Sequence, residues 1–159
     1  RKQISPAKFI SEEAVIADLK GRTSNEVICE LIDRAGAREK SVDCGIIREA
    51  ALDREGEYGT ALGSGIAIPH VRLEGLKSPL IAYGRSLDGI EWNAPDGYPV
   101  RHVFLLITPT GTDDIHVQSI ASIASAVSDE DNRRLLESGS ASSLPDELKR
   151  ILTRKSAGR

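Results

Sequence analysis

The sequence predicts a layered α/β domain in which a mixed β-sheet is flanked by helices on both faces. Segments with the apolar spacing of helices alternate along the chain with short apolar segments typical of strands. The turn signal Leu-Asp-Gly at residues 87–89 directly follows a predicted strand, and so brief a connection implies some antiparallel pairing. The 159 residues are the length of a single domain, with an expected core over residues 10–152.

The composition excludes several classes of function. Charged residues make up 28% of the chain and the formal net charge is −3, so there is no basic excess of the kind that binds nucleic acid. No apolar run approaches the roughly 20 residues that cross a bilayer, and residues 1–10 lack the apolar core of a secretory signal. We therefore expect a cytoplasmic protein without membrane insertion. The absence of methionine leads us to expect a domain trimmed or excised from a longer chain.

Two helices are predicted in the first third of the chain. Thr23 and Glu26 have the spacing of a capping box, and apolar residues follow at helical intervals until Gly36, where the helix is expected to end. A second helix is expected over residues 42–54, with Gly56 and Gly59 breaking it. The two cysteines, Cys29 and Cys44, are too few for a disulfide framework and are expected to be reduced.

A glycine-rich approach leads to the first histidine of the chain. Gly63-Ser64-Gly65 permits unusual backbone angles, and residues 66–68 are predicted to form a short strand. Pro69 ends that strand because it lacks a backbone donor, which leaves His70 exposed just past the strand end.

The second half of the chain predicts two longer strands and three helices. Residues 80–86 alternate in polarity like a strand, and residues 103–108 form an apolar strand expected at the centre of the sheet. Asp113 or Asp114 is expected to cap a helix that carries His116 in its first turn. Two further short helices are expected over residues 129–137 and 145–152.

Two of the three histidines are placed for chemistry. If strand ends and helix starts meet at one edge of the sheet, His70 and His116 face each other near the positive end of a helix dipole. A neutral imidazole is a good nucleophile toward phosphorus, and phosphoryl transfer requires mainly positioning and charge stabilisation. No Walker segment is present, so no nucleotide site is predicted.

The segment from Glu55 to His70, EGEYGTALGSGIAIPH, resembles the active-site signature of EIIA domains of the fructose/mannitol class of the phosphotransferase system. Nitrogen-regulatory IIA proteins share this class. The resemblance implies that His70 accepts a phosphoryl group from the phosphocarrier HPr or a related carrier and passes it to a IIB domain. The segment around His116 resembles the second histidine segment of the family, and Arg54 matches its upstream arginine.

The resemblance also suggests roles for the neighbouring residues. His116 would hydrogen-bond the imidazole or phosphoryl oxygens of His70, the guanidinium fork of Arg54 suits phosphate oxygens, and Thr60 is a candidate hydroxyl donor. No cofactor is implied. Val71 stands where the family usually has Gly, Ala or Cys, and it is expected to narrow the room beside the imidazole. Partners are expected to dock over residues 63–71.

Alternative functions stay open at this point. The domain is either a transport component or a regulatory module whose phosphorylation state controls a transporter, kinase or transcription factor; a IIA fold that binds partners without accepting phosphate is a third possibility. A metal site is disfavoured because the histidines and cysteines show no ligand spacing, and a serine hydrolase because Gly-Ser-Gly is not Gly-x-Ser-x-Gly. His102 is expected to be structural or on the surface, and Trp92 is expected to be a packing aromatic.

Overall fold

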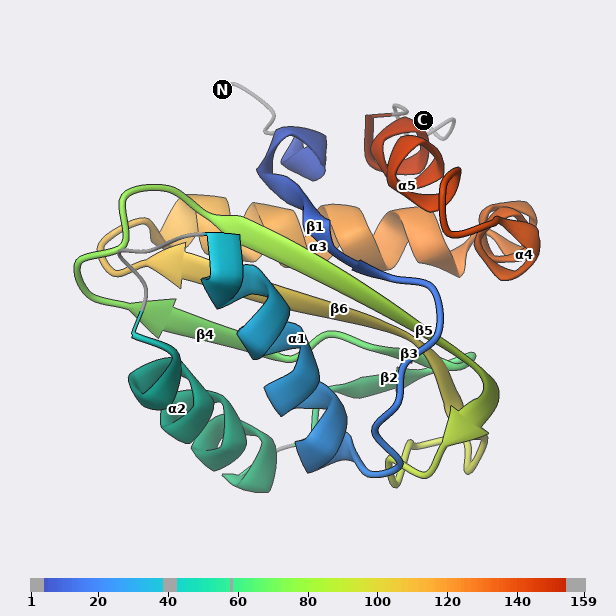
Figure 1. The fold of residues 1–159 in the computed structure, drawn as a ribbon, viewed down its shortest axis with the longest axis horizontal. Helices are drawn as coiled ribbons and strands as arrows, with labels where there is room; N and C mark the ends of the chain where they lie inside the picture. Colours follow the sequence, from blue (N-terminus) through green and yellow to red (C-terminus); the bar gives the residue numbers. More distant parts are fainter. Residues whose placement is uncertain (1–4, 39–42, 58, 154–159) are drawn as a thin grey trace.

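Six strands form one mixed sheet that lies between two layers of helices (Figure 1). The computed structural model describes residues 5–38, 43–57 and 59–153. The strand order is β1-β5-β6-β3-β2, and β4 continues the row of β3 along the same side of β6. Strands β5 and β6 are antiparallel, whereas β1 runs parallel to β5 and both β3 and β4 run parallel to β6. The strands are β1 (Ile10–Ile16), β2 (Ala61–Gly63), β3 (Ile66–Ala67), β4 (His70–Leu73), β5 (Leu80–Ile90) and β6 (Val100–Pro109).

The helices divide between the two faces of the sheet. In Figure 1, α1 (Ser24–Arg38) and α2 (Cys44–Glu57) lie in front of the sheet, and α3 (Asp113–Ser128) lies behind it. The helices α4 (Glu130–Ser138) and α5 (Leu144–Thr153) and the 3-10 turn η1 (Pro6–Phe9) pack on the side of α3. Each face has its own apolar core, so the predicted layered α/β class and the central position of β6 are confirmed.

Helix α1 begins as predicted but does not end where the sequence suggested. The Glu26 N–H donates to Thr23 Oγ1 at 3.1 Å, and the Glu26 carboxylate accepts from the N–H of Arg22, one residue before the cap. The expected stop at Gly36 is wrong, because α1 continues to Arg38. A Cβ at Gly36 would lie 2.0 Å from Cys44 Sγ, so this glycine lets α2 approach α1 closely. The interior glycine is a packing residue.

Helix α2 also runs past its predicted end. Gly56 was expected to break it, yet the helix extends to Glu57. Its predicted first residue, Val42, lies outside the described residues. The consequence for the site is that Arg54 sits inside the last helical turn, on a rigid element.

The predicted turn at residues 87–89 is instead an irregularity within a long strand. Strand β5 continues to Ile90, and its register slips because Arg85 faces His102 while Ile90 faces Val100. Five steps on β5 therefore match two on β6, and Gly89 (φ 85°) supplies the positive φ that such a bulge needs. The connection between the two antiparallel strands is residues 91–99. The predicted antiparallel pairing is confirmed for β5 and β6, but residues 87–89 lie within β5 and do not form the connection between the two strands.

Gly63-Ser64-Gly65 builds the β2–β3 hairpin rather than the surroundings of His70. Ser64 (φ 56°) and Gly65 (φ 78°) form the two-residue connection, which matches the preference of tight hairpins for left-handed residues. The Asp96 carboxylate accepts from the Ser64 N–H at 2.7 Å. This turn lies at the opposite end of β3 from His70, about 16 Å away along extended chain. The expected docking surface over residues 63–71 is therefore not continuous around the imidazole.

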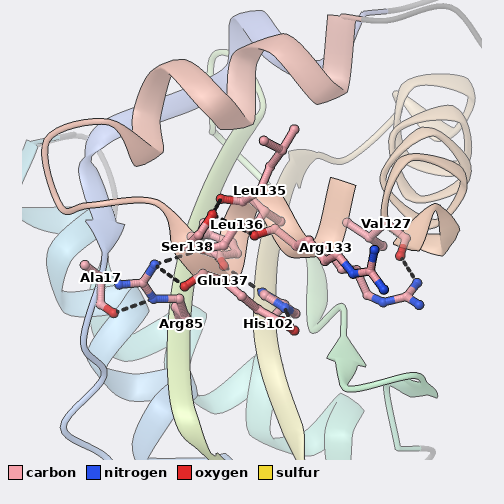
Figure 2. A network of polar contacts seen from close by, with 11 residues as sticks. Ala17, Arg85, His102, Val127, Arg133, Leu135, Leu136, Glu137 and Ser138 are labelled. Carbon is pink, nitrogen blue, oxygen red and sulfur yellow. Dashed lines mark hydrogen bonds and ion pairs between the residues drawn. The ribbon is translucent and has the colours of Figure 1, made fainter. Parts of the chain in front are cut away.

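A polar cluster closes the sheet at the start of β6 (Figure 2). Arg85 is 8% exposed and donates to the carbonyl oxygens of Ala17 at 3.0 Å and Leu136 at 2.8 Å, and also to those of Glu137 and Gly139. His102 Nδ1 lies 2.8 Å from the Tyr83 hydroxyl and His102 Nε2 lies 3.3 Å from the Glu137 carboxylate. We call Tyr83, Arg85, His102 and Glu137 the closed end of β6. Of the two expected placements of His102, structural or on the surface, the structure shows the buried one, with both ring nitrogens bonded.

Among the described residues, no helix combines the length and the apolar character that crossing a bilayer requires.

Candidate active site

His70 is the first residue of a strand, not a residue in a loop after one. Strand β3 ends at Ala67, and after Pro69 the chain pairs with β6 again as β4, where His70 lies opposite Leu106. The Leu106 N–H donates to the Pro69 carbonyl at 2.9 Å, which connects the two short strands along β6. The imidazole is half-buried and its backbone is held in the sheet. The sheet therefore presets its position.

The hydrogen bond of His70 decides which of its nitrogens is reactive. Nδ1 lies 2.7 Å from the carbonyl oxygen of Ile68, and a carbonyl accepts but never donates. Nδ1 therefore carries the proton and Nε2 keeps the lone pair. Burial lowers the pKa of His70, and the positive charges of Arg54 and Arg72 lower it further. The ring is consequently neutral near pH 7, which is the form that attacks phosphorus.

His116 lies beside His70, as the sequence predicted. The two ring centroids are 5.2 Å apart and the planes meet at 71°. His116 is in the first turn of α3, is 3% exposed, and its Nδ1 lies 2.6 Å from Thr108 Oγ1. Burial and the charge of Arg72 lower the pKa of His116 to about 4, so this ring is neutral too. The structure thus places two neutral imidazoles edge to face.

The cap of α3 differs from the prediction. Thr112 is the residue at the N-cap, where its side chain makes no capping bond, and Asp113 and Asp114 both lie within the first turn. The His116 N–H donates to the Thr112 carbonyl at 3.0 Å, so the unpaired donors at this helix start belong to the residues before His116. Acidic side chains in the first turn complement the helix dipole whether or not they cap it.

Two arginines lie within electrostatic reach of the paired rings. Arg54, in the last turn of α2, lowers the pKa of both His70 and His116. Arg72 does the same, and its Nε lies 3.1 Å from Asp113 Oδ1. Sequence reasoning found the first arginine and missed the second. Positions 70 and 72 share one face of a strand, so the signal was present, but β4 was not among the predicted strands.

Val71 does not crowd the imidazole. Successive side chains of β4 point to opposite faces, and Val71 is 5% exposed in the core beneath α1 and α2. His70 and Arg72 take the other face, toward α3. The expectation that Val71 narrows the room beside the active ring is therefore wrong, because the pleat of the strand separates the two side chains.

Thr60 belongs to the support of the site. Its hydroxyl donates to the Glu55 carboxylate, which also accepts from the Thr60 N–H at 2.8 Å and from Trp92 Nε1 at 2.9 Å. Thr60 is 5% exposed, and its proton is committed to Glu55 instead of a bound phosphoryl group. Trp92 packs in the core as expected and holds the residue that follows Arg54. These contacts fix the end of α2.

The groups that the structure brings together at this edge of the sheet suit phosphoryl transfer. A nucleophilic nitrogen, a second neutral imidazole and two guanidinium groups converge at one edge of the sheet. Within the described ranges, no group of three or more His, Cys, Asp or Glu side chains is placed to hold a metal ion. We call His70, Arg72, Thr108 and His116 the open end of β6.

Comparison with known proteins identifies the family of the chain. Residues 8–155 match the family described as "Phosphoenolpyruvate-dependent sugar phosphotransferase system, EIIA 2". The chain therefore belongs to the EIIA type-2 family of the phosphotransferase system, a family of phosphoryl-transfer components.

Two curated relatives carry names from sugar transport. The fructose-specific EIIA component of Haloferax volcanii is 32% identical over 150 residues, which cover 94% of each chain. The fructose-specific EIIABC component of Bacillus subtilis is 30% identical over 143 residues, which cover 87% of this chain but 22% of the relative. The chain thus spans about a fifth of that longer protein.

Solved structures share the fold. The nitrogen regulatory protein IIA-Ntr of Neisseria meningitidis superposes with a TM-score of 0.83 at 27% identity, covering 92% of this chain and 98% of that one. Enzyme IIA-Mtl of Escherichia coli, solved in a complex with phosphorylated enzyme IIB-Mtl, superposes with a TM-score of 0.70 at 23% identity, covering 94% and 97%. The similar proteins thus include both transport and regulatory members.

Proposed function

We propose that His70 is the residue of this chain that carries the phosphoryl group, receiving it from a phosphohistidine of HPr or a related carrier. The observation behind this proposal is the bond of His70 Nδ1 to the Ile68 carbonyl, which leaves the lone pair on Nε2 of a ring that lies beside His116 and within electrostatic reach of Arg72. A neutral ring held in one tautomer needs no deprotonation before it attacks.

The transfer step balances without a cofactor. The Nε2 lone pair of His70 forms a bond to phosphorus while the nitrogen–phosphorus bond of the donor breaks, and its electron pair returns to the donor imidazole. Positive charge then develops on the His70 ring, where the Nδ1–H bond to Ile68 stabilises it. No proton has to leave the site in this step.

The surrounding groups act on the charge of the transferred phosphoryl group. Arg54 and Arg72 lie within electrostatic reach of both rings and supply positive charge, and a guanidinium fork matches two phosphate oxygens. His116 adds a hydrogen-bond donor from the start of α3. Because Arg72 pairs with the exposed Asp113 in the resting chain, binding a phosphoryl group means exchanging one anion for another.

The acceptor would be a IIB domain, whose cysteine or histidine removes the phosphoryl group by the reverse of the same step. A related EIIA solved in complex with a phosphorylated IIB supports this choice of partner. The half-buried imidazole is accessible to a visiting side chain at the edge of the sheet, which suits short-lived contacts with two partners in turn.

Labelling with a reconstituted phosphoryl chain tests the assignment. The protein is incubated with phosphoenolpyruvate, enzyme I and HPr, and an acid-labile, base-stable phosphate is expected on the wild type and absent from His70→Gln. The matched control is His102→Gln, a histidine on the same sheet but at the closed end, which should be labelled. Label on His70→Gln at the wild-type level would show that another residue carries the phosphate.

A regulatory role is the second candidate, favoured by the similarity to the nitrogen regulatory protein of Neisseria meningitidis. In that role the phosphorylated chain keeps its phosphate and the charge change alters binding to a target protein. The two roles separate in a chase: rapid loss of label on adding a fructose-type IIB domain supports transport, and retained label supports regulation.

A further inference from the structure

The polar contact beneath His116 involves Thr108, which the transfer mechanism has not used so far. Thr108 lies near the end of β6, is fully buried, and faces α3. Its Oγ1 is 2.6 Å from His116 Nδ1, a short distance for a bond between two neutral groups. Within the described part of the chain, Thr108 Oγ1 makes no other hydrogen bond and His116 Nε2 makes none.

The position of the proton between Thr108 Oγ1 and His116 Nδ1 follows from which of the two groups can donate and which can accept. If Nδ1 carried the ring proton and donated to Oγ1, the hydroxyl proton of Thr108 would be buried without an acceptor, which is the costly case. If the hydroxyl donates, Nδ1 accepts, both groups are satisfied, and the single ring proton sits on Nε2. The neutral state of His116 at pH 7 allows only one such proton.

We propose that Thr108 is a positioning residue that fixes His116 as the Nε2–H tautomer, so that its free nitrogen donates to the phosphoryl group on His70. The two rings then present Nε2 atoms of opposite kind: His70 offers a lone pair set by the Ile68 carbonyl, and His116 offers an N–H set by the Thr108 hydroxyl. The role in transfer rests on the proposed function, whereas the tautomer does not.

The tautomer matters because the opposite one would repel the group being transferred. A lone pair on His116 Nε2 would face phosphoryl oxygens that carry negative charge, and the ring would contribute no donor. A donor fixed in advance costs no reorganisation during the step. A hydroxyl in the buried strand is thus expected to affect the transfer rate without touching the phosphoryl group.

Nitrogen-15 NMR of the imidazole rings tests the tautomer directly. Wild type and Thr108→Ser are expected to show His116 with a protonated Nε2, because both keep the hydroxyl. Thr108→Val, which has nearly the same shape, removes the bond that selects the tautomer, so His116 is expected to populate both the Nε2–H and the Nδ1–H forms while His70 stays unchanged. A wild-type spectrum with His116 protonated at Nδ1 would overturn the proposal.

The rate of phosphate acceptance tests the consequence. Thr108→Val is expected to slow acceptance about tenfold and Thr108→Ser to restore it; the loss is partial because the ring can still tautomerise. In a His116→Gln background the amide NH₂ donates whatever residue 108 is, so Thr108→Val should then change the rate less than twofold. An equal loss in both backgrounds would mean a general structural defect and overturn the proposal.

The two levels of the proposal fail separately. A wild-type chain that never accepts phosphate would overturn the proposed function and the role of Thr108 in it, whatever the spectrum shows. A chain that accepts phosphate normally as Thr108→Val, with its tautomer changed, would overturn the role of Thr108 and leave the proposed function standing. Thermal unfolding of each variant establishes that the comparison is between folded chains.

Discussion

A buried histidine lies near each end of β6, His102 on the strand itself and His116 on α3, and the hydrogen bonds of the two rings differ. His102 and Thr108, the contact of His116, face the same side of the strand about 20 Å apart. At the closed end both nitrogens of His102 have partners, Tyr83 and Glu137. At the open end His116 Nδ1 is bonded to Thr108, whereas its Nε2 has no hydrogen-bond partner among the described residues, and a second imidazole lies beside the ring.

This difference separates a histidine with a structural role from the histidines that we propose for phosphoryl transfer. Burial lowers the pKa of His102 as it does that of His116, so a shifted pKa does not separate the two. The two arginines differ in the same way. Arg85 is buried and donates to carbonyls at the end of α4, whereas Arg72 is exposed and, among the described residues, pairs with the surface carboxylate of Asp113.

Replacing His116 and His102 in turn should give the largest difference in phosphate acceptance rate and in stability. His116→Ala is expected to slow phosphate acceptance by about 100-fold, because a donor to the phosphoryl oxygens is lost. His102→Leu is expected to leave the acceptance rate within about twofold and to lower the free energy of unfolding by about 2 kcal/mol, since the buried Tyr83 hydroxyl and the partly exposed Glu137 carboxylate lose their bonds. Rapid-quench labelling and urea unfolding measure the two effects. A slower rate for His102→Leu than for His116→Ala would break the comparison.

The arginine pair should repeat the pattern on a smaller scale. Arg72→Met is expected to slow acceptance about tenfold with a stability change under about 0.5 kcal/mol, because exposed ion pairs stabilise little. Arg85→Met is expected to lower the free energy of unfolding by about 2 kcal/mol without slowing acceptance, because the carbonyls at the end of α4 lose their donor. If Arg72→Met proves the more destabilising variant, the open end is structural as well.

The pH dependence sharpens the comparison further. At pH 6.5 an imidazole with an unshifted pKa would be about half protonated. Because the pKa of His70 is lowered, the rate of phosphate acceptance at pH 6.5 should instead stay close to the rate at pH 8. The unfolded chain binds protons to all three histidines more readily than the folded chain does, so stability should fall as pH drops from about 6.5 toward 4. Stopped-flow labelling and denaturation at several pH values test both. A rate that halves by pH 6.5 would show that the shift is absent.

The smallest effect is expected at the border of the open end. Thr60→Val should change the acceptance rate less than about twofold, because the hydroxyl is already bonded to Glu55, while stability drops by about 1 kcal/mol. Thr60→Ser, which keeps the hydroxyl, is the control. A tenfold slower Thr60→Val with Thr60→Ser at the wild-type rate would place that hydroxyl in direct contact with the phosphoryl group.

Much of the candidate site could be predicted from the sequence because it depends on the spacing of nearby residues. The alternation of helical and strand segments predicted the layered fold, and the placement of His70 after Pro69 and of His116 at a helix start predicted their meeting. Arg72 was missed because β4 has only four residues, too few for a clear alternation. The roles of Gly36 and Gly89 were predicted wrongly because a glycine can end a helix, allow a close contact or form a bulge, and the local sequence does not distinguish these roles.

The sequence by itself indicated the layered α/β class, the approximate bounds of most helices, and the meeting of His70 with His116. These depend on spacing and on the chemistry of single residues, which short segments already contain. Only the tertiary structure decided which nitrogen of each histidine is bonded, since the partners come from elsewhere: Tyr83 and Glu137 lie 19 and 35 residues from His102 along the chain. A tautomer is the property of a contact between distant segments, and such contacts exist only once the sheet has assembled.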